Sequence, residues 1–320
     1  MAELALHPAQ ASIGARLARV PGVAWMLAFL VIGFALSAES FLSGPNLINI
    51  GLQSVILLML ALPMTLIIMT EGLDISMGAV LTLASVVLAW MLAHGSGLPV
   101  ALACALLTGM LFGLLNGSLV ALLKLPPFVV TLGTLGAAQG LALVVTDGQS
   151  IVNIGQGIQS VYAGRLLGIP IPLWMGAIAY ALTHVLLYHT RFGTYVFAMG
   201  GNRDALQLAG IRADRYLIAV YVFGGLMAGM ASLLLTARMN SGHPTAAIGM
   251  EFDAIAAVIV GGTSFERGNG WLAGTLLGVL TVGALRNGLN LMSVASSVQV
   301  ACIGLLVILA LLIDGLKVRR

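Results

Sequence analysis

The sequence predicts an all-α integral membrane protein, a bundle of about ten transmembrane segments. Only 8% of its 320 residues are Asp, Glu, Lys or Arg, whereas 60% are hydrophobic. A soluble domain carries about 25% charged residues. The few charges cluster, and the stretches between them approach the roughly 20 apolar residues that a helix needs to cross a bilayer. The positions of the charges therefore define the predicted spans.

The predicted spans follow one another in the intervals between charges. Two spans fit between Asp74 and Lys124, because residues 94–99 contain two glycines and a proline that end one helix. The apolar piece 254–262 is too short to cross alone unless irregular backbone lined by protein continues it. The other spans are expected one each within 19–39, 39–71, 124–147, 172–189, 216–237, 271–291 and 297–313.

The basic residues predict the orientation, because short cytoplasmic loops retain Lys and Arg. With ten spans and the N-terminus inside, only Arg165, Arg238 and Arg286 fall toward the outside. Residues 1–20 and 315–320 are then cytoplasmic tails, and 21–314 form the transmembrane domain. The basic residues expected on the cytoplasmic side are Arg16, Arg19, Lys124, Arg191, Arg203, Arg212, Arg215, Arg267, Lys317, Arg319 and Arg320.

The sequence contains none of the common catalytic, metal-binding or nucleotide-binding patterns. Its five histidines are dispersed, so no metal site and no catalytic residue is predicted. Cys104 and Cys302 lie in apolar spans, where a thiol acts as a small hydrophobe. A phosphate-binding P-loop needs Gly-Lys followed by Ser or Thr, which neither Lys124 nor Lys317 provides. Any use of ATP is therefore expected to depend on a partner.

Glycines recur at intervals of four residues, a spacing that lets helix backbones approach closely in a membrane. The pattern predicts a tightly packed bundle. The glycines concerned are Gly109, Gly113 and Gly117; Gly136 and Gly140; Gly225 and Gly229; and Gly270, Gly274 and Gly278.

A first polar segment, 71–78, lies between two predicted spans and allows two interpretations. Asp74 or Ser76 can cap the free N–H groups of the helix that follows. Alternatively, a broken helix exposes its N-terminus and an acidic side chain to a hydrophilic path. Uncharged polar residues in neighbouring spans suit a neutral polyhydroxylated solute, although hydrogen bonding between helices explains them equally well. The candidates for the path are Asp74, Ser76, Asn116, Thr131, Thr134 and Gln139.

A second polar segment, at about 190–215, is predicted to be cytoplasmic. Asn202 is expected to cap a short helix that runs through Ala209 and ends at Gly210. The segment is either a solvated loop or an amphipathic helix that binds a soluble partner through an apolar patch containing Leu208. The residues predicted for that contact are Asn202, Arg203, Asp204, Ala205, Leu208, Ala209 and Gly210.

A third polar segment, 238–270, carries a resemblance to a known family. At 238–245, 249–258 and 261–264 the chain resembles the ribose-type permeases of ATP-binding-cassette (ABC) importers, whose superfamily also holds branched-chain amino acid permeases. Gly72-Leu73-Asp74-Ile75-Ser76 is similar to the family signature G-[IL]-D-[IL]-S. The resemblance extends from about residue 46 to 314, and includes 190–193, 200–202 and 287–291.

The resemblance implies a permease subunit, not an enzyme, in a bacterial inner membrane. It implies a second permease chain as partner, identical or different, and two cytoplasmic ATP-binding subunits or one fused tandem ATPase, which bind the ATP and Mg. A periplasmic sugar-binding protein is the third implied partner, with Arg165, Arg238 and Glu251 as candidates for docking it. Membrane lipid surrounds the chain, and nucleic acid has no role.

Two departures from the family pattern and three rival functions remain. His243 stands where relatives commonly have Gln, and Glu266 and Arg267 stand where relatives have small residues. The rival functions are an ion-coupled secondary transporter of a small polar solute and a permease for a solute other than sugar; a membrane scaffold is the third alternative. A proton-coupled carrier usually buries a titratable relay in mid-span, and this chain has no such candidate deeper than Asp74 or Arg286.

Overall fold

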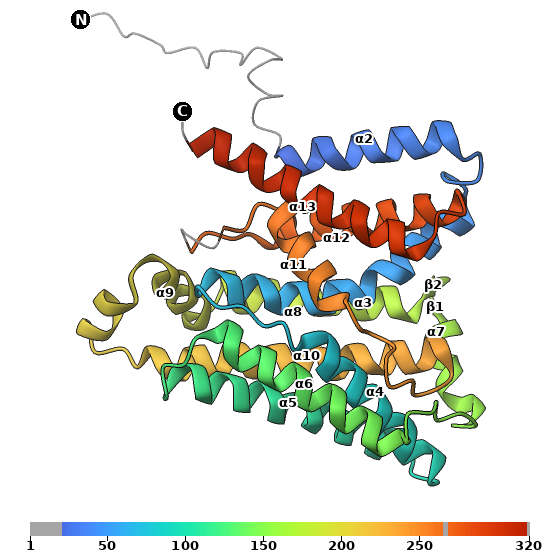
Figure 1. The fold of residues 1–320 in the computed structure, drawn as a ribbon, viewed down its shortest axis with the longest axis horizontal. Coiled ribbons are helices and arrows are strands. Elements are labelled where there is room, and N and C mark those ends of the chain that lie inside the picture. Colours follow the sequence, from blue (N-terminus) through green and yellow to red (C-terminus); the bar gives the residue numbers. More distant parts are fainter. Residues whose placement is uncertain (1–20, 265–267, 319–320) are drawn as a thin grey trace, which may run out of the picture.

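The computed structural model describes residues 21–264 and 268–318, which form a helical bundle with one short β-hairpin (Figure 1). Its elements are α2 (Gly22–Ser37), α3 (Gly44–Met69), α4 (Met77–Ala93), α5 (Leu98–Ala121), α6 (Pro127–Thr146), the 3₁₀ helix η1 (Gln156–Ile158), α7 (Gln159–Ala163), β1 (Arg165–Leu166), β2 (Ile169–Pro170), α8 (Ile171–Tyr188), α9 (Arg191–Leu208), α10 (Ala213–Met239), α11 (Met250–Val260), α12 (Leu272–Leu291) and α13 (Ser296–Val318).

Two ends of the bundle organise the topology (Figure 1). The terminal end is the one at which α2 begins and α13 ends; it also carries α9 and the loop with Lys124. The hairpin end carries α7 and the β1–β2 hairpin. The described arginines from 191 to 215 lie at the terminal end, whereas Arg165 and Arg238 lie at the hairpin end. The basic residues from 191 to 215 and the two arginines Arg165 and Arg238 thus lie at opposite ends of the bundle, as the sequence predicts.

The spans agree with the prediction of about ten segments. Six helices, α3, α5, α6, α8, α10 and α12, are long and apolar enough to cross a membrane. Gly22–Ser37, Met77–Ala93 and Ser296–Leu309 are shorter apolar helices. With α11, these make up the predicted set, and the chain is a multi-pass membrane protein. The predictions for residues 1–20, Glu266, Arg267, Arg319 and Arg320 lie outside the described residues.

Helix α3 runs through the centre of the bundle and contacts α8, α10, α11 and α12 (Figure 1). Every residue from Ser54 to Met69 is buried. A helix that is apolar on all sides is typical of such a central position. Hydroxyl and amide pairs fix its neighbours: Asn46 and Asn287 exchange two hydrogen bonds of 2.9 Å, and the Thr65 and Thr275 hydroxyls lie 2.6 Å apart. These pairs join α3 to α12.

Glycines bring α5 and α10 into backbone contact, as the four-residue spacing predicts. A Cβ on Gly225 would overlap the backbone of Gly109, and one on Gly113 would overlap the backbone of Tyr221. Gly274 and Gly278 likewise approach the backbone of α11. At Gly136 and Gly140 an added Cβ would have no atom of the described chain within 4 Å, so close packing at these two glycines stays a prediction. This face of α6 is uncovered by the rest of the described chain.

Helices α4 and α11 both begin halfway through the bundle (Figure 1). Non-helical chain leads to α4 from the terminal end and, as a series of turns, to α11 from the hairpin end. The Ala247 N–H donates to Thr82 Oγ1 at 3.2 Å, which joins the two starting points. The short apolar piece expected at 254–262 is therefore continued by irregular backbone that the protein lines, the condition on which it can lie at membrane depth.

Candidate functional site

Asp74, Ser76 and Asn116 form a buried polar cluster between α4 and α5. Asp74 Oδ1 accepts hydrogen bonds from the Ser76 N–H at 2.9 Å and from the Ser76 hydroxyl at 2.6 Å. Asn116 Nδ2 donates to Ser76 Oγ at 2.9 Å. Asp74 is 3% exposed, and the space of about 170 Å³ beside the three residues does not admit a water molecule. The cluster is thus closed in this conformation.

The capping interpretation was wrong for Ser76, and for Asp74 it stays a prediction. Ser76 is the N-cap residue of α4, but its hydroxyl makes no capping hydrogen bond because it donates to Asp74. Asp74 in turn binds the N–H of Ser76 and not an N–H of the first helical turn. Because the Asp74 and Ser76 side chains form a hydrogen bond with each other, the first turn of α4 has no side-chain cap.

The other three candidates for the path also make contacts within the chain. Thr131 Oγ1 donates to the backbone carbonyls of Pro127 at 2.9 Å and Leu73 at 3.2 Å, and Thr134 Oγ1 donates to that of Val130. Gln139 Nε2 donates to the Pro244 carbonyl at 2.7 Å and so ties α6 to the chain before α11. Their contact with a solute stays a prediction.

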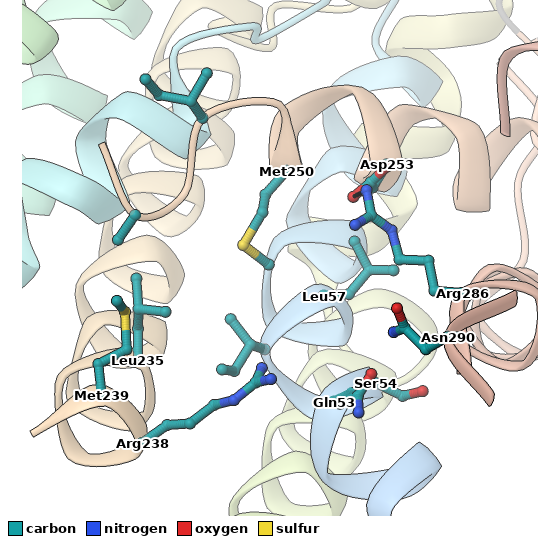
Figure 2. Close-up of a pocket in the computed structure, with 14 residues that line it drawn as sticks. Gln53, Ser54, Leu57, Leu235, Arg238, Met239, Met250, Asp253, Arg286 and Asn290 are labelled. Atoms are coloured by element: carbon teal, nitrogen blue, oxygen red, sulfur yellow. Dashed lines mark hydrogen bonds and ion pairs between the residues drawn. The ribbon is translucent and has the colours of Figure 1, made fainter. Parts of the chain in front are cut away.

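A cavity of about 420 Å³ lies between α3, α10, α11 and α12 (Figure 2). This volume falls within the roughly 300–1,000 Å³ of small-molecule sites. One part of its wall is apolar, formed by side chains such as Leu57, Ile248 and Met250. The polar residues of the wall are Gln53, Ser54, Arg238, Asp253, Arg286 and Asn290. None of the six predicted path residues is among its lining.

An ion pair forms the most strongly polar part of this cavity. Arg286 Nη2 of α12 donates to Asp253 Oδ2 of α11 at 2.5 Å (Figure 2). The Asp253 side chain is 10% exposed and that of Arg286 is 36% exposed. Arg286 Nε and Ser54 Oγ are buried without a hydrogen-bond partner in the described part of the chain. Each such group costs about 1–3 kcal/mol unless water or a ligand binds it.

Further hydrogen-bonding groups surround the pair. Figure 2 shows Arg238 extending from α10 toward Gln53 of α3. Gln53 Nε2 donates to Asn49 Oδ1 at 3.2 Å, and Asn290 Oδ1 accepts from Gln299 Nε2 at 2.8 Å. Sequence reasoning missed Gln53, Asp253 and Asn290 as site residues. The available signal was the ionisable Arg286 in the middle of an apolar span, since such residues tend to be functional.

The segment near 202 has the local structure that the sequence predicts. Helix α9 is longer than expected and has a kink at Asn202, with φ −164° and ψ 97°. Asn202 Oδ1 accepts from the Ala205 N–H at 2.9 Å, which caps the second part of the helix. The helix ends at Leu208, and Gly210 follows with a φ of +81°. Leu208 is 90% exposed at the terminal end.

One charged residue of this segment, Arg203, forms an ion pair with α10. Arg203 Nη2 donates to Asp214 Oδ1 at 2.8 Å, with both side chains more than one-third exposed. Asp204, Ala205 and Ala209 are exposed beside Leu208. The second half of α9 thus presents an apolar residue within a charged surface, the arrangement expected for either interpretation of the segment.

The three candidates for docking a binding protein differ in position. Arg165 and Arg238 are exposed at the hairpin end. Glu251 is 4% exposed in the first turn of α11, halfway through the bundle. This burial contradicts the docking role predicted for Glu251. His243, a departure from the family pattern, accepts at Nδ1 from the Thr245 N–H at 3.2 Å and does not line the cavity.

Comparison with known proteins identifies the family. The family model described as "Branched-chain amino acid transport system / permease component" matches residues 46–311. The chain belongs to this permease family. It is 40% identical to the ribose import permease protein of Bacillus subtilis over 293 residues, 91% of each chain. No solved structure matches it.

Other members of the permease family are similar over nearly the whole chain. The D-allose transport system permease protein of Escherichia coli K12 is 34% identical over 92% of this chain and 91% of its own. The L-arabinose ABC transporter permease protein of Azospirillum brasilense is 29% identical over 98% of this chain and 92% of its own. The names of these relatives are those of transport permease proteins.

Proposed function

We propose that this chain is the inner-membrane permease subunit of an ATP-driven ABC importer that carries a monosaccharide. The observation that carries the proposal is the 40% identity to a ribose import permease over 91% of both chains. Relatives named for D-allose and L-arabinose align over at least 91% of both chains, so the shared chemistry is that of a small neutral sugar.

The proposed orientation places the terminal end in the cytoplasm and the hairpin end in the periplasm. Basic loops are retained on the cytoplasmic side, and Lys124 with the arginines of 191–215 lies at the terminal end. Both termini are then cytoplasmic. Arg165 and Arg238 at the hairpin end are the proposed contacts for a periplasmic sugar-binding protein.

ATP hydrolysis is proposed to take place on a separate ATPase, which binds the ATP and Mg. The sequence has no P-loop lysine. The second half of α9, with Leu208 exposed beside Asp204, is the proposed contact for that ATPase. A second permease chain completes the importer, as the resemblance implies. The chain itself contributes the path and the coupling surface.

Uptake into proteoliposomes tests this proposal. The chain is reconstituted with a candidate ATPase and a candidate sugar-binding protein, with ATP inside and radiolabelled D-ribose, D-allose or L-arabinose outside. We expect ATP-dependent uptake of one of these sugars that persists when a protonophore collapses the proton gradient. Uptake by the chain alone, driven by a pH step, would instead support the ion-coupled carrier. ATP-dependent uptake of L-leucine without sugar uptake would identify a non-sugar permease.

A further inference from the structure

The cavity between α3, α10, α11 and α12 is lined by residues of four helices and of the segment before α11, and it is partly open to the outside of the bundle. Its lining comes mainly from the half of the molecule that carries the hairpin end, the side proposed to receive the solute (Figure 2). The position therefore suits an early stage of import.

The charges in the wall indicate that the cavity holds water or a polar solute. Asp253 and Arg286 would be costly at this depth if lipid chains filled the space. The Arg286 side chain is 36% exposed and so reaches the cavity, and Arg238 points into the same region (Figure 2).

The mixture of groups fits the chemistry of a monosaccharide. A sugar ring presents hydroxyls around its edge and C–H groups on its faces. Asp253 and Asn290 offer acceptors and donors for hydroxyls, while Met250 and Leu57 offer an apolar surface for a ring face. Hydrogen bonds to charged groups are stronger than those between neutral groups, so the ion pair is the part that fixes the sugar's orientation.

We infer that this cavity is a monosaccharide-binding station within each permease chain, in which Asp253 and Arg286 bind ring hydroxyls. The inference rests on the proposed function and extends it, because it gives the sugar a binding position that neither the relatives' names nor the family signature assigns. The same two residues exclude a branched aliphatic side chain from the polar part of the wall.

Protection of an introduced cysteine tests the inference on the intact importer. Ile248 lines the cavity and is 61% exposed, so Ile248→Cys places a reactive thiol in its wall. Cys104 and Cys302 are first replaced by alanine. We expect millimolar transported sugar to slow modification by a membrane-impermeant thiol reagent at least threefold, and L-leucine to have no effect. Gln149→Cys, exposed at the same end outside the cavity, is the control and should be unaffected by either solute.

Two further variants identify the groups responsible. Asp253→Asn combined with Arg286→Gln removes both charges together, so no lone charge stays buried. In the Ile248→Cys background, this pair of changes should abolish most of the protection by sugar. Ile248→Trp fills the cavity and should lower uptake at least tenfold, whereas Val152→Trp, exposed at the same end, should leave it near normal.

The outcomes separate this inference from the proposed function. If the unmodified importer takes up no sugar with ATP, the proposed function fails, and the sugar station fails with it. If that importer takes up sugar but Ile248→Cys is not protected, or is protected equally by L-leucine, only the station is overturned. Protection that survives the removal of both charges would overturn the role of Asp253 and Arg286.

Discussion

The carboxylate of Glu251 lies against the Cα of Gly78, where the N-termini of the half-helices α11 and α4 meet. A Cβ on residue 78 would overlap Glu251 Oε2 and lie 2.8 Å from the Ala247 carbonyl oxygen. Glu251 Oε1 accepts from the Gly249 N–H at 3.1 Å. A negative charge is favourable beside helix N-termini, and the Glu251 side chain lies beside the N-termini of both α11 and α4. At position 78 only glycine leaves room for it.

We expect Gly78→Ala to destabilise the chain by about 1–3 kcal/mol, the usual cost of overpacking a filled interior. Alanine is otherwise a better helix former than glycine by about 1 kcal/mol. A loss of stability can therefore be attributed to the overlap of the new Cβ with Glu251. Unfolding of the purified chain in mixed micelles by SDS measures the effect. Gly136→Ala, where no atom lies within 4 Å of the new Cβ, is the control and should not be destabilising. Equal stability of the two variants would refute the close packing at residue 78.

The contact between α5 and α10 gives a second stability prediction. Gly225→Ala would place a methyl group into the backbone of Gly109, which cannot move without separating the helices. We expect a loss of about 1–3 kcal/mol and a lower yield of folded protein, measured by size-exclusion chromatography after extraction. Gly140→Ala has the same spacing signature in sequence but no neighbour in space, and should behave like the unmodified chain.

Most of the fold could be predicted because charge is costly inside a bilayer. Intervals without charge located the spans, and the brevity of 254–262 predicted that irregular backbone must accompany α11. The hairpin at Arg165–Pro170 was missed, since its two-residue turn at Leu167 and Gly168 lacks the usual asparagine or aspartate. The spacing of Gly136 and Gly140 predicts a packed helix face but does not say what covers it, and no part of the described chain lies against these two glycines.

The candidate cavity could not be predicted from the sequence. Gln53, Arg238, Asp253 and Arg286 come from four helices, and their convergence depends on how those helices cross. The isolated Arg286 was a signal that a partner must exist, but Asp253, 33 positions away, became that partner only because α11 begins halfway through the bundle. Local motifs, in contrast, were predicted well: the Asn202 cap depends on residues three positions apart.

Leu208 provides a test of the proposed coupling surface. It is 90% exposed on the second half of α9, so Leu208→Glu should not disturb folding. A charge in an apolar contact is poorly tolerated. We therefore expect that the ATPase no longer co-purifies with the variant and that sugar uptake falls at least tenfold. Gln207→Glu adds the same charge one residue earlier, also at an exposed position, and should retain both. If the Leu208→Glu importer assembles normally, the segment is a solvated loop and not the contact for the ATPase.

Asp74 separates a structural role from a role in the path. Its Oδ1 accepts both hydrogen bonds from Ser76, and asparagine keeps an oxygen in that position. If the Asn116 amide turns over, its Oδ1 can accept from the new amide, and this bond replaces the one from Asn116 Nδ2 to Ser76 Oγ. We therefore expect Asp74→Asn to keep expression and sugar uptake within about twofold of normal.

Asp74→Ala is the matched contrast to this variant. It removes the acceptor of the buried Ser76 N–H and hydroxyl, and leaving such groups unsatisfied costs about 1–3 kcal/mol, so folded yield should fall. Uptake kinetics and ATPase activity of both purified importers distinguish the two roles. If Asp74→Asn slows uptake several-fold while ATP hydrolysis and assembly stay normal, the carboxylate meets the solute in another conformation of the cycle, and the closed Asp74–Ser76–Asn116 cluster is one state of the path.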